Sequence, residues 1–93
     1  MPSGWVSVRC VFRSRHDGEQ VYEERVTLWR TADPAHAIAW AEAEAREYAA
    51  GLSGPPGFAT EYAGLAQAYL LADAPAHGAE VFSLTRASDL GPA

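Results

Sequence analysis

Apolar and polar residues alternate along the first part of the chain. From Trp5 to Arg13, the apolar side chains Val6, Val8, Cys10 and Phe12 occupy every second position. Successive side chains of an extended strand point to opposite faces, so this spacing is typical of a strand that buries one face. The pattern predicts a half-buried strand over residues 5–13.

A second alternating segment runs from Tyr22 to Thr31. Its side chains form two sets, with Val26 and Leu28 on one face and Arg25, Thr27 and Trp29 on the other. We expect the face with Val26 and Leu28 to meet the core. The opposite face carries the Trp29 ring and the Arg25 charge, and packing of a core does not explain their presence there.

The loop between these two segments decides which side chains share a face. The Asp17–Gly18 pair between two strand patterns is a strong hairpin signal. A plain two-residue turn would set Val8 opposite Thr27 and mix the faces. A three-residue loop that starts at His16, with Gly18 in the left-handed region, would set Val8 opposite Val26 and keep the apolar side chains together. We therefore expect the three-residue loop.

A helix is predicted directly after the second strand. Asp33 is a favourable N-cap, Pro34 suits the first helical position, and the following residues up to position 50 are rich in Ala and Glu. Gly51 should end the helix. The stripe expected to lie on the sheet consists of Ile38, Ala41, Ala45, Tyr48, Ala49 and Leu52. Trp40 falls off that stripe, so it should be partly exposed unless another segment or chain covers it.

The sequence pattern defines the secondary structure of the remaining residues less clearly. Residues 58–72 fit a helix and a strand about equally well by spacing. Residues 79–86 are typical of a strand, which needs a neighbour, and this favours a second hairpin formed with the preceding segment. Residues 87–93 should form a loose tail.

Composition limits the possible functions. A chain of 93 residues with 48% hydrophobic and 20% charged residues is expected to form a single folded domain over 1–93, with its core within 5–86. The formal charge of −5, without a basic run, argues against a nucleic-acid partner. The single cysteine cannot form an internal disulfide, and no apolar run is long enough for a membrane span. We expect a cytoplasmic protein.

Four sequence blocks carry a resemblance to a known family. They are Tyr-Glu-Glu-Arg-Val-Thr-Leu-Trp from position 22, Ala-Ile-Ala-Trp-Ala-Glu-Ala-Glu-Ala from 37, Leu-Ala-Gln-Ala-Tyr-Leu-Leu from 65 and His-Gly-Ala-Glu-Val-Phe-Ser-Leu from 77. Together they resemble a small bacterial family of domains of unknown function, numbered four-two-eight-eight. The resemblance implies an α+β fold in the order strand-strand-helix-strand-strand, a four-stranded mainly antiparallel sheet with one helix on one face. It makes residues 65–71 a strand and implies no activity. The Gly- and Pro-rich link at 51–57 departs from the family pattern.

Few residues indicate catalytic chemistry. His16, His36 and His77 lack the spacing of a metal site, and we expect neither a metal nor a cofactor. Cys10 lies on the predicted core face, where a small buried thiol is usually inert. We therefore expect no catalytic residue among them.

Four of the candidate binding residues lie on the predicted outer face of the sheet, whereas Glu24 falls on the predicted inner face and Trp40 on the predicted helix. The expected register sets Trp5 opposite Trp29 and Arg9 opposite Arg25. The full set of partner- or ligand-binding candidates is Trp5, Arg9, Arg25, Trp29, Glu24 and Trp40. Because Trp, Tyr and Arg are enriched in interfaces, this pattern favours a non-enzymatic protein-binding or accessory module that forms a homodimer through its sheet face, with a second protein as a possible partner.

One alternative is a small enzyme or ligand-binding protein with a pocket at the dimer interface. There Glu24 would act as a base, and Arg9 or Arg25 would hold an anionic substrate. The sequence leaves the pathway and any ligand open.

Overall fold

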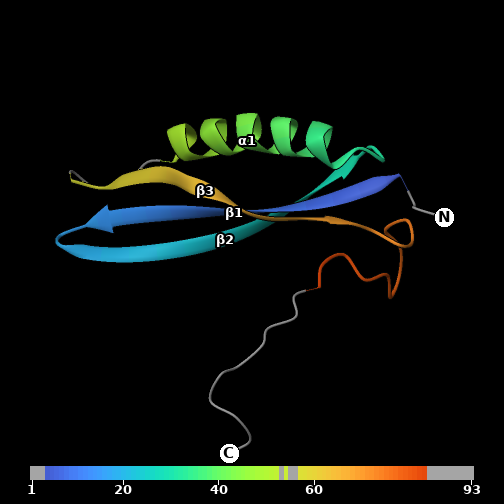
Figure 1. Ribbon diagram of the computed structural model, residues 1–93. Coiled ribbons are helices and arrows are strands. Elements are labelled where there is room, and N and C mark those ends of the chain that lie inside the picture. The colour runs from blue at the N-terminus through green and yellow to red at the C-terminus, as the bar shows by residue number, and fades with distance from the viewer. Residues whose placement is uncertain (1–3, 53, 55–56, 84–93) are drawn as a thin grey trace, which may run out of the picture.

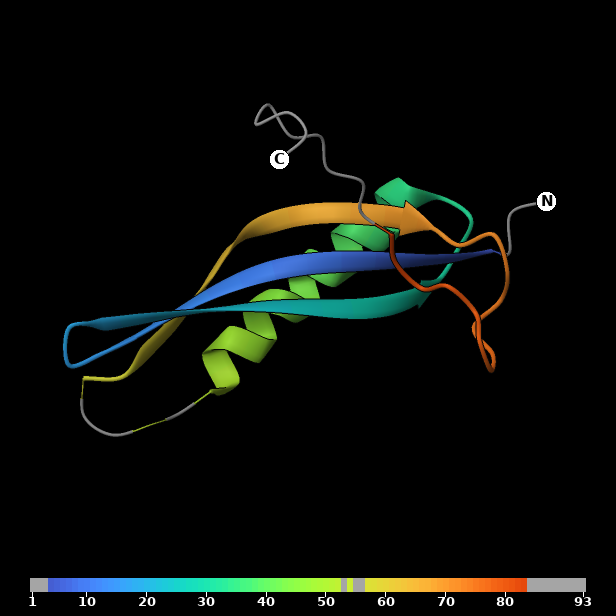
Figure 2. The same cartoon turned by 90° about the horizontal axis from the view of Figure 1, so that it is seen from below.

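The protein combines an antiparallel sheet with one helix packed on one face. The computed structural model describes residues 4–52, 54 and 57–83. The elements in chain order are β1 (Trp5–His16), β2 (Glu19–Arg30), α1 (Pro34–Gly51) and β3 (Ala59–Leu70). Among the described residues the sheet has three strands in the order β2-β1-β3, and α1 crosses it obliquely (Figures 1 and 2). The predicted α+β class, with a single helix on an antiparallel sheet, is confirmed.

β3 resolves the ambiguity left by the local sequence. Residues 59–70 form a strand, as the family resemblance implied, and it pairs antiparallel with β1. The fourth strand, expected over 79–86, falls partly outside the described residues; its described part, 79–83, has no regular secondary structure and lies on the sheet side away from α1 (Figure 1). The expected tail at 87–93 lies wholly outside them.

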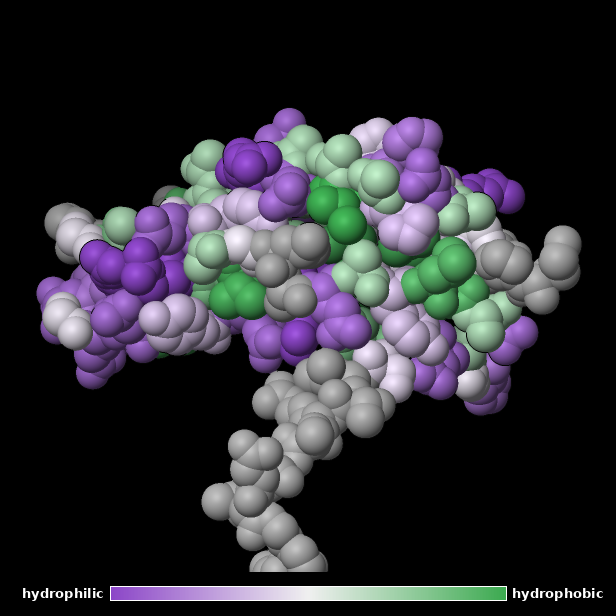
Figure 3. Space-filling view, viewed as in Figure 1, coloured by the Kyte–Doolittle hydropathy of each residue, from purple (hydrophilic) through white to green (hydrophobic). Residues whose placement is uncertain are grey.

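The β1–β2 loop differs from the three-residue loop expected from the sequence. Asp17 and Gly18 alone form the turn, with φ angles of 51° and 79°. Positive φ at both central residues defines a type I′ turn, whose twist matches the twist of the flanking strands. The turn lies at the end of the molecule where hydrophilic side chains gather (Figure 3). The match between the type I′ turn and the strand twist therefore outweighs the apolar pattern, which favoured the three-residue loop.

The two-residue turn reverses the predicted faces of β2. Val8 lies opposite Thr27, and Val6 lies opposite Trp29. The expected pairings of Val8 with Val26 and of Trp5 with Trp29 are therefore wrong. Since a shift of one residue moves each side chain to the other side, Trp29 turns toward the helix, while Val26 turns away from it.

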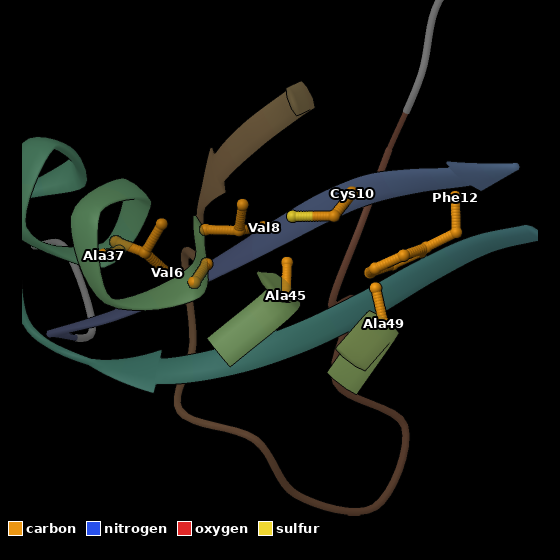
Figure 4. Packing of buried hydrophobic residues seen from close by; sticks show 8 residues of the cluster. Val6, Val8, Cys10, Phe12, Ala37, Ala45 and Ala49 are labelled. Atoms are coloured by element: carbon orange, nitrogen blue, oxygen red, sulfur yellow. The ribbon is translucent and has the colours of Figure 1, made fainter. Parts of the chain in front are cut away.

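Close packing of alanines joins the helix to the sheet. Ala37, Ala41, Ala45 and Ala49 recur every fourth residue on α1 and are buried. They pack against the buried face of β1, which consists of Val6, Val8, Cys10 and Phe12 (Figure 4). The predicted core face of the first strand and the buried Cys10 are confirmed.

The observed stripe on α1 is turned slightly from the expected one. Ile38 and Tyr48 are only half-buried, and Leu52 is exposed. Small Cβ methyl groups form the centre of this contact, so the backbones approach closely, and the Tyr48 ring packs on the Phe12 ring beside them.

The predicted ends of α1 are confirmed. Asp33 accepts a hydrogen bond from the Ala35 amide at 2.9 Å, and Pro34 occupies the first turn. The helix ends at Gly51, as the sequence indicated, and the Leu52 amide donates to the Ala49 carbonyl at 3.4 Å. These caps satisfy backbone groups that have no partner within the helix.

Candidate protein interface

The structure divides the six candidate residues between different surfaces. On the sheet face away from α1, which we call the open face, lie Trp5, Arg9 and Glu24. Arg25 and Trp29 lie on the face toward the helix, and Trp40 lies on the helix itself. The expected cluster of two tryptophans and two arginines on one face is therefore not formed.

Trp29 belongs to the packed side of the sheet. Its ring packs against the buried core, and its Nε1 donates a hydrogen bond to Thr27 Oγ1 at 2.8 Å. Trp40 lies beside it, with ring centroids 6.4 Å apart, and remains 48% exposed. The predicted partial exposure of Trp40 is confirmed, whereas Trp29 contributes to the core rather than to an outer surface.

Arg25 connects β2 to α1. Its Nη1 lies 2.5 Å from Glu44 Oε1, and its guanidinium lies 4.0 Å from the centre of the Tyr48 ring. The Tyr48 hydroxyl in turn donates to both carboxylate oxygens of Glu23 at 2.9 and 3.0 Å. The Glu23 hydrogen bond raises the pKa of Tyr48 above its ordinary value, because loss of the hydroxyl proton would place two negative charges together. These contacts fix the helix over the edge strand.

Arg9 and Glu24 form the polar centre of the open face. Arg9 Nη1 lies 2.9 Å from Glu24 Oε1, so Glu24 pairs with an arginine. The Glu24 side chain is 55% exposed, whereas that of Arg9 is largely covered. Part of the cover over Arg9 is the Phe82 ring, 5.0 Å from the guanidinium carbon.

The segment after β3 folds back over part of the open face. The Tyr69 hydroxyl donates to Glu80 Oε1 at 3.0 Å, and the Tyr69 and Phe82 rings lie 6.2 Å apart. The Glu80 carboxylate raises the pKa of Tyr69. These residues did not stand out in the sequence, because only the return of the chain onto β1 and β3 brings them together.

A row of side chains on β2 remains exposed on the open face. The exposed fractions of Tyr22, Val26 and Leu28 are 61%, 43% and 39%. Together with Glu24 and Arg30 on the same face of β2, these side chains form what we call the β2 surface. The sequence prediction assigned Val26 and Leu28 to the core, so it missed this surface. Their alternation with charged residues was visible, but the sequence pattern does not show which face the helix covers.

The buried polar groups near Cys10 have structural partners. Burial raises the pKa of the Cys10 thiol. The Tyr62 hydroxyl donates to Glu42 Oε2 at 2.6 Å, and burial together with this hydrogen bond raises the pKa of Tyr62. The described residues contain no group of three or more His, Cys, Asp or Glu side chains placed to bind a metal ion.

The hollows found on the surface lie away from Glu24. Two of them, with volumes of about 280 and 310 Å³, lie at the hairpin end of the sheet. His16 and Glu19 line both hollows, and Glu24 lines neither. Within the described part of the chain, Glu24 therefore lies outside these two hollows.

Comparisons with known proteins return no relative. No family model, no curated protein and no solved structure matches the chain. The described part of the chain contains no helix with both the length and the apolar character needed to span a membrane. The arguments for function therefore come from the geometry of the sheet.

Proposed function

We propose that the protein is a non-enzymatic protein-binding module that self-associates through its sheet, with the β2 surface as the contact region. The observation that supports this most is the row of Tyr22, Val26 and Leu28, which are exposed together on one strand. Contiguous apolar side chains on a soluble domain usually mark an interface, because covering them removes apolar area from water.

A second copy of the chain is the occupant that the β2 surface fits best. The apolar pair Val26 and Leu28 lies between Glu24 on one side and Arg30 on the other. A surface that carries both charges around an apolar centre is complementary to itself after a two-fold rotation. The same rotation would place each glutamate near an arginine of the other copy.

The geometry gives less support to an enzyme. That alternative requires Glu24 in a cleft near Arg9 or Arg25. Glu24 is instead exposed at the strand edge, and Arg25 lies on the opposite face of the sheet, engaged with Glu44. An exposed carboxylate that is already paired lacks the environment that usually prepares a general base.

Size-exclusion chromatography with light scattering tests the proposal. The 10.0 kDa chain should elute with twice that mass, and Val26→Asp should shift it toward the monomer while its circular dichroism spectrum shows that the fold is kept. Leu52→Asp is the matched control, because Leu52 is similarly exposed (39%) but lies at the end of α1. A wild-type chain that stays monomeric up to about 1 mM would overturn the proposal.

A further inference from the structure

The outer edge of β2 lacks the bulges and prolines that often protect an edge strand from pairing with another strand. β2 is 12 residues long, contains no Pro or Gly, and pairs with β1 without a register shift. The other edge strand, β3, has two register shifts against β1 and a glycine, Gly64, at φ 138°. Bulges and kinks of this kind normally block edge pairing, and a long regular edge invites it. Among the described residues no strand pairs with the outer edge of β2.

The free backbone groups of this edge belong to the same residues as the β2 surface. The Trp5 carbonyl accepts a hydrogen bond from the Leu71 amide at 2.9 Å, so Trp5 directs its backbone away from β2. Backbone direction alternates along a strand, so Val6 and Val8 direct theirs toward Trp29 and Thr27. Thr27 and Trp29 therefore direct their backbone groups toward β1. The residues that alternate with them on β2, Val26, Leu28 and Arg30, direct their amides and carbonyls outward, away from β1.

We infer that β2 pairs antiparallel with β2 of a second copy, about a two-fold axis at Thr27, to form one continuous sheet. This inference rests on the proposed self-association and specifies its geometry. Val26 then lies opposite Leu28 of the second copy, and Glu24 lies opposite Arg30 of the second copy. Each contact occurs twice, because the axis makes the interface symmetric.

Cross-strand pairing favours this register over its neighbours. Two copies can form hydrogen bonds only in registers that place the outward backbone groups of one β2 opposite those of the other. Neighbouring registers of this kind differ by one residue in the position of the two-fold axis. An axis at Arg25 would oppose the two Arg25 side chains, and an axis at Val26 would set Glu24 opposite Leu28. An axis at Leu28 would set Val26 opposite Arg30. The axis at Thr27 pairs opposite charges with each other and apolar side chains with each other.

The surroundings of the edge are compatible with this pairing. α1 packs mainly over β1 and β3 and least over β2, so the helix does not cover the whole edge strand. Within the described residues Arg30 has no carboxylate partner; its guanidinium lies 5.9 Å from the centre of the Trp5 ring. Glu24 is exposed and can receive a second arginine.

Disulfide trapping tests the register. In a Cys10→Ala background, single cysteines are introduced as Arg25→Cys, Val26→Cys, Thr27→Cys and Leu28→Cys, and the covalent dimer is measured after equilibration in a glutathione buffer. Thr27→Cys should form the most covalent dimer, because residues opposite each other at a non-hydrogen-bonded site have Cα atoms about 4.5 Å apart. A maximum at another position would overturn the register but leave self-association intact. If the two copies instead packed through their open faces, the helix-side variants Arg25→Cys and Thr27→Cys would form no covalent dimer.

A charge exchange provides a second test. Arg30→Glu and Glu24→Arg should each weaken the homodimer by about tenfold or more, since each creates two pairs of like charges. Mixing the two variants should restore the affinity, because in the mixed dimer both pairs are again opposite in charge. Failure of the mixture to associate, while the wild-type chain is dimeric, would overturn the inference. A monomeric wild type would instead overturn the proposed function.

Discussion

Arg25 on β2 and Glu44 on α1 form an ion pair of 2.5 Å between Nη1 and Oε1. Both side chains are about one-third exposed or less, so solvent screens the pair only in part. The same guanidinium stacks on Tyr48, one helical turn further on. The edge strand is thus held to the helix by these polar contacts and by Trp29, whereas β1 is held by the alanine core.

Removal of the Glu44 charge should loosen this connection. Glu44→Gln keeps the length of the side chain and should lower the free energy of unfolding by about 0.5–1 kcal/mol, the range of partly exposed ion pairs. Urea denaturation measures the change. It should shrink in about 1 M NaCl, where the screening length is about 3 Å. Glu47→Gln, at an exposed position of the same helix, is the control, and an equal effect there would contradict the assignment.

The close approach of α1 to the sheet predicts an asymmetric response to larger side chains. Ala45 is buried against the sheet, so Ala45→Leu should destabilise the fold by about 1–3 kcal/mol through overpacking. Ala39 is exposed on the same helix, and Ala39→Leu should change stability by less than about 0.5 kcal/mol. Thermal or urea unfolding of both variants gives the comparison. Similar losses at the two positions would show that the helix does not pack as described.

The two tryptophans at the helix–sheet contact should differ in importance. Trp29 packs on the core and donates to Thr27, so Trp29→Ala should cost about 2 kcal/mol or more. Trp40 is about half exposed, so Trp40→Ala should cost about 1 kcal/mol or less. Denaturation midpoints followed by circular dichroism decide this. The sequence-based register predicts the opposite outcome for Trp29, namely loss of assembly without loss of the fold.

The protein should lose stability in alkaline solution. The fold raises the pKa of Cys10 above 9.0 and that of Tyr62 above 10.0, so both groups favour their protonated forms in the folded state. Their contribution is fully present below those values and declines as the pH rises through and above them, because the unfolded chain ionises first. Urea midpoints between about pH 7 and pH 11 measure the decline. Tyr62→Phe should flatten it, and an unchanged slope would contradict the role of Tyr62.

Local patterns in the sequence were sufficient for the helix and for the buried side of β1. Asp33, Pro34 and Gly51 act on neighbouring backbone groups, so their roles could be predicted without knowledge of the fold. The alternation from Val6 to Phe12 marks one apolar face, because the opposite positions are mostly polar. The spacing at 59–70 also fits a helix, so the strand was predicted from the need of residues 79–86 for a neighbour and from the family resemblance.

The candidate site was predicted only in part. Trp40 is exposed as expected. Arg9 and Glu24 lie together on the open face only in the observed register, because the expected register put Glu24 on the inner face. The grouping with Arg25 and Trp29 failed because it depended on the register of a single hairpin. The contacts of Tyr69 with residues 80 and 82 were not foreseeable, because they join segments with no shared local pattern.

The sequence by itself determined where the first strand begins, where the helix begins and ends, and which side of β1 faces the core, because these depend on interactions between near neighbours. It could not determine which side of β2 is buried, because β2 carries apolar residues on both sides: Val26 and Leu28 on one, Trp29 on the other. The tertiary structure decided this through the two-residue turn at Asp17 and Gly18. A difference of one residue in a loop inverts an entire strand, since side chains alternate with a period of two residues.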